Sequence, residues 1–187
     1  MQKLSKVLGA FVFCFSCVLA SSAVAKDEEP QKRVITTQQL ASEIQANTRF
    51  LAAKSLKKAK SLLETYGDFA PFGAALFPSG KVRFVWAIKP GELDKDVNPV
   101  VVLNAVRSAL KSQADNGRIL GSAVVYKFQP DNDRDGKQIN VELEYMTGFA
   151  EVLGTQYQET ADGFEYGEGA VQPYDPVIFK SDEKPKE

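Results

Sequence analysis

Three aspartates in the C-terminal half of the chain have the spacing of a metal-binding loop. Asp131, Asp133 and Asp135 stand at the first, third and fifth positions, Gly136 at the sixth and Glu142 at the twelfth. In a calcium loop, closely spaced carboxylates supply the oxygen ligands that a hard cation requires, and the glycine permits a sharp turn. Asp131, Asp133 and Asp135 are therefore candidate calcium ligands.

The flanking sequence favours a different structure for this loop. A calcium loop of this spacing lies between helices, whereas residues 131–136 lie between two segments that resemble strands. If residues 139–145 are extended, Glu142 is carried about 20 Å from Gly136, too far to close the site. Asp, Asn and Gly are also common in ordinary turns. We expect a solvated hairpin loop, and the alternative is a weak calcium site.

A second group of carboxylates lies in the strands that follow. Glu142 and Glu144 share one face of their strand, and Glu151 falls on the next strand. Paired carboxylates perform general acid–base chemistry when their environments separate their pKa values. The alternation of residues 139–145 places these glutamates on the polar face, so we expect a solvated surface. A carboxylate-dependent hydrolase is the alternative.

The composition excludes several kinds of chemistry. The chain has no histidine, and its two cysteines, Cys14 and Cys17, both lie within the first 25 residues. Beyond residue 25 there is consequently no disulfide, thiolate nucleophile, imidazole base or ordinary zinc site. No cofactor is expected, apart from the calcium alternative.

The N-terminus has the three parts of a secretory signal peptide. Lys3 and Lys6 precede an uncharged apolar run at residues 7–20, and Ala23-Val24-Ala25 supplies a cleavage site before Lys26. The alternative, a retained anchor, requires a longer apolar run. Removal of residues 1–25 leaves 21 basic and 24 acidic residues, a net charge of about −3. We therefore expect a periplasmic or secreted protein without nucleic-acid partners and without stable membrane insertion after cleavage.

The remaining sequence predicts an α+β fold with two main helices and an antiparallel sheet of about five to six strands. Thr37 to Tyr66 lacks Gly and Pro and ends before Gly67, as a helix would. The other expected elements are a hairpin at 72–77 and 81–88, a helix from Pro99 to Asn116-Gly117, and strands at 119–128, 139–145, 149–158 and 164–171. We expect both helices on one face of the sheet. The predicted domain is 37–175, between flexible segments at 26–36 and 176–187.

The stretch from Leu62 to Ala74, which contains Tyr66-Gly67 followed by Asp68-Phe69-Ala70-Pro71-Phe72-Gly73, resembles the opening of a family of small, mostly uncharacterised bacterial α+β domains. The resemblance would extend roughly over residues 37–175, and it implies a fold without an activity. The order of elements is also similar to that of profilin-like and roadblock-type domains, which bind partners. From the residues themselves, we expect Phe69, Pro71 and Phe72 to serve in core packing.

Together these features predict a non-enzymatic binding or accessory module of the bacterial envelope. An unidentified protein partner is the expected ligand. The alternatives are a carboxylate-dependent hydrolase and a weak calcium-binding protein that uses Asp131, Asp133 and Asp135.

Overall fold

The computed structural model describes residues 36–94, 96–129 and 136–180. In chain order, its elements are α1 (Thr37–Tyr66), β1 (Phe72–Leu76), β2 (Val82–Trp86), α2 (Pro99–Asp115), β3 (Gly121–Phe128), β4 (Gln138–Tyr145), β5 (Ala150–Thr160) and β6 (Gly163–Pro173). This order confirms the predicted α+β fold. None of the helices in the described residues is long and apolar enough to cross a membrane.

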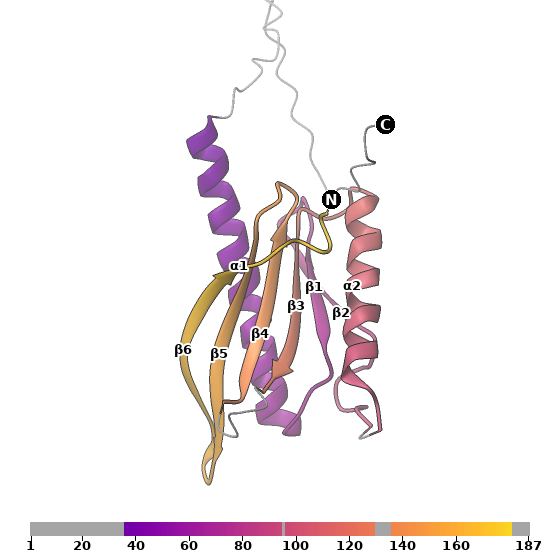
Figure 1. Ribbon diagram of the computed structural model, residues 1–187, viewed down its shortest axis with the longest axis vertical. Coiled ribbons are helices and arrows are strands. Elements are labelled where there is room, and N and C mark those ends of the chain that lie inside the picture. Colours follow the sequence, from indigo (N-terminus) through magenta and orange to yellow (C-terminus); the bar gives the residue numbers. More distant parts are fainter. Residues whose placement is uncertain (1–35, 95, 130–135, 181–187) are drawn as a thin grey trace, which may run out of the picture. The chain divides into compact units, whose positions relative to one another are not determined.

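The six strands form one sheet in which every neighbouring pair is antiparallel (Figure 1). The strand order is β2-β1-β3-β4-β5-β6, so β2 and β6 are the two edges of the described sheet. The connection from β1 to β3 runs through β2 and α2, and the last four strands follow one another as a meander.

Helix α1 spans the residues that the sequence predicts for it. Thr36 accepts a hydrogen bond from the Gln39 N–H, and the Gln39 side chain accepts one from the Thr36 N–H, which together form a capping box. At the other end, Gly67 has a φ of 72°, and its N–H donates to the Leu63 carbonyl at 2.8 Å.

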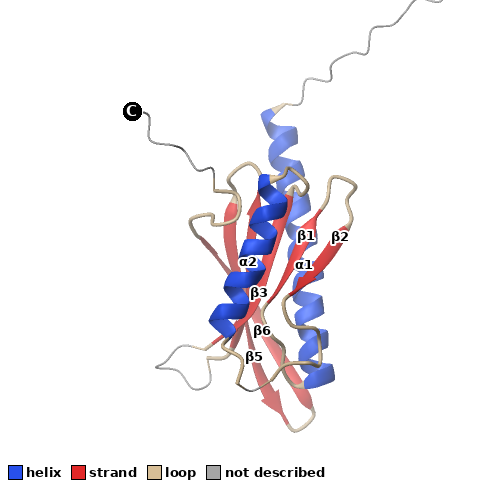
Figure 2. Ribbon diagram, turned by 90° about the vertical axis from the view of Figure 1, so that its right-hand side faces the viewer, coloured by secondary structure: helices blue, strands red, loops and turns tan. Residues whose placement is uncertain are grey.

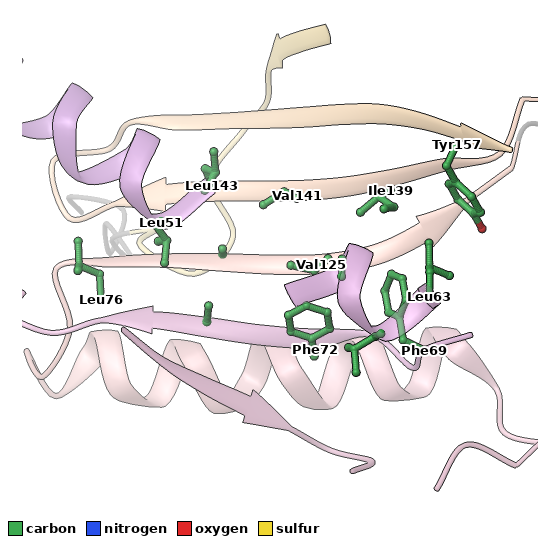
Figure 3. Packing of buried hydrophobic residues seen from close by; sticks show 14 of the residues in the cluster. Leu51, Leu63, Phe69, Phe72, Leu76, Val125, Ile139, Val141, Leu143 and Tyr157 are labelled. Atoms are coloured by element: carbon green, nitrogen blue, oxygen red, sulfur yellow. The ribbon is translucent and has the colours of Figure 1, made fainter. Parts of the chain in front are cut away.

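The larger core lies between α1 and one face of the sheet (Figure 3). Small residues on the helix, Ser55 and Ala59, allow it to approach the small Ala74 and Ala123 of β1 and β3. Larger side chains complete the cluster at the ends: Leu51 packs toward one end, and Leu63, Phe69, Phe72 and Tyr157 gather at the other.

Helix α2 packs on the opposite face of the sheet (Figure 2), which corrects the expectation that both helices share one face. Val106 and Leu110 of α2 are buried with Ala75 and Val124, whose neighbours in β1 and β3 point toward α1. Strands β1 and β3 are therefore covered on both faces, and all of β1 and the first five residues of β3 are buried without alternation.

The approach of α2 to the sheet depends on Gly73. A Cβ atom at this position would lie 2.9 Å from Leu110 Cδ1 and 3.0 Å from Val106 Cγ1. The Phe72-Gly73 pair thus serves both cores, because Phe72 fills the α1 side and Gly73 leaves room on the α2 side.

Candidate functional site

A cavity of about 720 Å³, which we call the end cavity, lies where α1 ends and α2 begins. Its walls come from the segment after α1, the loop between β2 and α2, the end of β3, and the adjoining parts of β5 and β6. The side chains used in the argument below are Tyr66, Asp68, Phe69, Trp86, Leu93, Lys127, Phe128 and Tyr157.

The wall after α1 is fixed by local contacts. Tyr66 packs against the next loop at Gly91, where a Cβ atom would lie 3.0 Å from the Tyr66 ring and where φ is 82°. The Asp68 carboxylate accepts a hydrogen bond from the Phe69 N–H at 2.6 Å and forms an ion pair with Lys127 at the end of β3. The segment after α1 therefore turns at Gly67, and its contacts with Gly91 and Lys127 fix it on both sides of the end cavity.

Behind this wall, an aromatic cluster forms the base of the cavity. The Phe72 ring is fully buried, with its centroid 5.7 Å from Phe69, 5.9 Å from Phe84 and 4.8 Å from Trp86. Lys58 of α1 lies 5.8 Å from the centre of the Trp86 ring. Phe69 and Trp86 thus line the cavity while they are anchored in the core, which confirms the packing expected for Phe69 and Phe72.

Among the described residues that line the end cavity, acidic and basic side chains are equal in number. Three acidic residues, Asp68, Asp94 and Glu159, and three basic residues, Lys89, Lys127 and Lys137, are among the lining residues. Prolines and aromatic rings make up much of the remainder, including Pro71, Pro90, Pro99, Phe128 and Phe164. Such a surface favours a ligand that is largely uncharged and offers apolar groups to rings.

Tyr157 supplies a polar group to the cavity. Burial, together with the nearby Asp68 and Glu159 carboxylates, raises the pKa of its phenol above 10.0. The hydroxyl therefore stays protonated at neutral pH, where it can donate and accept hydrogen bonds but is not a proton-abstracting base.

The two glutamates expected on a solvated face are buried, which corrects that expectation. Glu144 is 1 % exposed and accepts four hydrogen bonds, all within the fold. Its Oε1 accepts from the Tyr174 hydroxyl at 2.8 Å and the Val177 N–H at 2.9 Å, and its Oε2 accepts from the N–H groups of Ile178 and Phe179, each at 2.8 Å.

This single carboxylate fastens the segment that follows β6 across the α2 face of the sheet. The chain stays packed beyond residue 175, because Ile178 is buried with Val106 and Leu110 of α2. Burial and the neighbouring Glu144 raise the pKa of Tyr174, so its hydroxyl remains the donor.

Glu142 is held by α2 in a similar way. Arg107 donates to its carboxylate from Nη2 at 2.5 Å and from Nε at 3.2 Å, and the Tyr126 hydroxyl donates at 3.0 Å. Neither Glu142 nor Glu144 lines the end cavity. The alternation in residues 139–145 identified the strand correctly, but it could not show that α2 and residues 174–179 would cover its polar side.

The candidate calcium ligands Asp131, Asp133 and Asp135 lie outside the described residues, so the calcium site remains a prediction. Glu142, the twelfth position of that pattern, lies in β4 and is bound to Arg107. Within the described residues, no three acidic side chains gather in a way that could hold a metal ion.

No protein-family model, curated protein or solved structure matches this chain. The resemblance of Leu62 to Ala74 to small bacterial domains consequently assigns no family. Function must be inferred from the end cavity and from the groups that surround it.

Proposed function

We propose that this protein is a non-enzymatic binding module of the bacterial envelope and that the end cavity receives a largely uncharged segment of a partner protein. The observation that carries the proposal is the lining of the cavity. Rings and prolines surround it, and the described residues of the lining include three acidic and three basic side chains, which balance one another. Prolines and aromatic rings suit an extended peptide, because they offer flat apolar surfaces that require no matching charge.

The buried carboxylates support binding over the alternative of a hydrolase. A carboxylate that acts as an acid, base or nucleophile must reach the substrate. Glu144 instead directs both oxygen atoms to groups of the protein itself, and Glu142 is engaged by Arg107 and Tyr126. The hydrogen bonds that Glu142 and Glu144 make within the fold explain why both are buried, so their burial does not call for a catalytic role.

The envelope location rests on the sequence of residues 1–25, which has the charge, apolar run and small residues of a cleavable leader. Mass spectrometry of the protein purified from an expressing bacterium tests this part. The expected N-terminal residue is Lys26. A mature chain that retains Met1, or one with lipid on Cys17, would contradict it.

The chain contains one tryptophan, and Trp86 lines the end cavity, so its fluorescence reports on binding there directly. Short peptides in acidic, basic and uncharged pools are titrated into the protein, each pool rich in proline and aromatic residues. We expect the uncharged pool to shift the Trp86 emission to shorter wavelength, because a bound segment displaces water from the ring. The response should change little with salt.

Leu93→Ser alters the cavity wall and should weaken this response at least several-fold, whereas Val101→Ser, on the exposed side of α2, should leave it unchanged. A Trp86 emission that no pool changes would contradict the proposal. A response from the acidic or basic pool alone would show that charge, rather than the rings, selects the ligand.

A further inference from the structure

We propose that two copies of this chain associate through the outer edge of β6, in an antiparallel pairing centred on Ala170 that joins their sheets. The proposal is independent of the end cavity. It rests on the exposure of β6, the direction of its backbone groups and the way its sequence complements itself.

The second half of β6 is an open edge. Strand β6 has 11 residues, and all of those from Gly167 to Pro173 are exposed. The first half is held against α1 by Tyr166, whose ring lies 4.1 Å from the Lys60 ammonium. The opposite edge strand, β2, has only five residues, and Arg83 within it and Lys81 before it add charge. Charge and short length discourage pairing at an edge, and residues 167–173 of β6 contain one charge, on Glu168.

The hydrogen bonds of β5 fix which backbone groups of β6 face outward. The Tyr174 N–H donates to the Ala150 carbonyl at 3.4 Å, and backbone direction alternates along a strand. Ala170 therefore turns its N–H and C=O toward β5, whereas Gly169 and Val171 turn theirs toward the free edge. The backbone of Pro173 also faces the free edge, so the N–H that proline lacks is not needed for pairing with β5.

These outward groups are complementary to those of a second copy. A twofold axis at Ala170 pairs Gly169 of each copy with Val171 of the other, so that four N–H and C=O pairs form hydrogen bonds. The same register places Glu168 opposite Gln172 of the second copy and brings no two like charges face to face.

Apolar side chains beside this edge add to the pairing. Val171 is 56 % exposed, on the face toward α1. It lines an open groove of about 910 Å³ together with Leu153 of β5, Phe149 just before β5, and Ile44 of α1. Leu153 extends across Gly169, where a Cβ atom would lie 2.8 Å from Leu153 Cδ1. In the paired arrangement, Val171 of the second copy lies next to these side chains and removes their surface from water.

The test uses engineered cysteines in a background with Cys14→Ser and Cys17→Ser, so that no other thiol remains. Ala170 meets its own copy at a non-hydrogen-bonded position, where Cα atoms are about 4.5 Å apart, a distance that a disulfide spans. Ala170→Cys should therefore form a covalent dimer upon mild oxidation. A mixture of Glu168→Cys and Gln172→Cys should form a mixed dimer, whereas each alone should not.

Val101→Cys on α2 is the matched control for an exposed cysteine away from β6. In sedimentation analysis, the molecular mass of the unmodified protein should rise with concentration toward that of a dimer. Ala170→Glu places two carboxylates opposite each other across the axis, so this variant should keep the mass of a monomer while its circular dichroism is unchanged.

Equal crosslinking of Ala170→Cys and Val101→Cys, or a single-chain mass at every concentration, would overturn the proposal. Efficient crosslinking of Gln172→Cys with itself would overturn the register. A disulfide between Ala170→Cys and a different envelope protein, in place of its own copy, would assign the edge to a foreign strand and also overturn the dimer.

Discussion

Replacement of Glu144 by glutamine removes a charge from a buried side chain of the α2 face while it preserves the shape. Each carboxylate oxygen accepts two hydrogen bonds, from Tyr174 and Val177 at Oε1 and from Ile178 and Phe179 at Oε2. The amide group of glutamine has one oxygen, so one of these positions becomes a donor.

The amide nitrogen is expected at the Oε1 position. The Tyr174 hydroxyl can rotate there and accept from the amide, so that only the Val177 N–H loses its partner, whereas at the Oε2 position two backbone N–H groups would lose theirs. One unsatisfied buried donor costs about 1–3 kcal/mol, and the remaining bonds lose the strength that the charge gives them. We expect Glu144→Gln to lower the free energy of unfolding by about 2–4 kcal/mol.

Chemical denaturation measures this loss, and hydrogen exchange locates it. The amides of Val177, Ile178 and Phe179 should exchange faster in Glu144→Gln, while those of β1 should follow the global change only. Glu43→Gln, on the exposed part of α1, removes the same charge and should change stability by less than about 0.5 kcal/mol. If Glu144→Gln were equally harmless, the carboxylate would not be what fastens the C-terminal segment, and the reasoning would be refuted.

Three other perturbations probe the same fold. Gly73→Ala should cost about 1–3 kcal/mol in denaturant unfolding, because its new methyl group forces α2 away from the sheet, and a neutral result would contradict the close contact. A double-mutant cycle with Arg107→Met and Glu142→Leu should give a coupling of about 1–3 kcal/mol, and additive losses would mean that the ion pair is not formed. Burial raises the folded-state pKa of Tyr174, and that of Tyr166 to about 12, so the folded protein binds more protons than the unfolded chain above pH 10. The contribution of these neutral phenols to the free energy of unfolding should thus be fully present below about pH 10 and should decline above it. Tyr174→Phe should make that decline shallower.

The sequence predicted the elements well because their ends depend on local chemistry. Gly67 ends α1 in a left-handed conformation, and Asn98 with Pro99 begins α2, as the residue types required. Strand β4 was recognised from its alternation for the same reason, since the period of two is a property of the strand alone.

What lies against each face of the sheet depends on distant parts of the chain, and there the sequence was less informative. The run Ala123-Val124-Val125 and the run at 72–76 have no polar side, which is typical of strands covered on both faces, yet we expected both helices on one face of the sheet. Glu144 gave no such indication. Its burial depends on backbone N–H groups more than 30 residues later, which no pattern in β4 can show.

Likewise, the sequence singled out residues of only one wall of the end cavity, and it did not predict the cavity itself. Phe69 and Phe72 were expected in the core, and they are buried there, yet their segment also forms a wall of the cavity. The opposite wall includes Leu93 from the loop before α2 and Lys127 and Phe128 from the end of β3, and it shares no motif with the first wall.

Crosslinking in the living cell tests the central claim, that the end cavity receives a partner protein, most directly. A photoreactive amino acid replaces Phe128, which lines the cavity and is 45 % exposed, and in a control it replaces Val101, which is 64 % exposed on α2. Upon illumination, the Phe128 variant should yield a discrete adduct with one envelope protein, and Leu93→Ser in the same chain should suppress it. Adducts that are absent, or that form equally from the Val101 variant, would contradict the account.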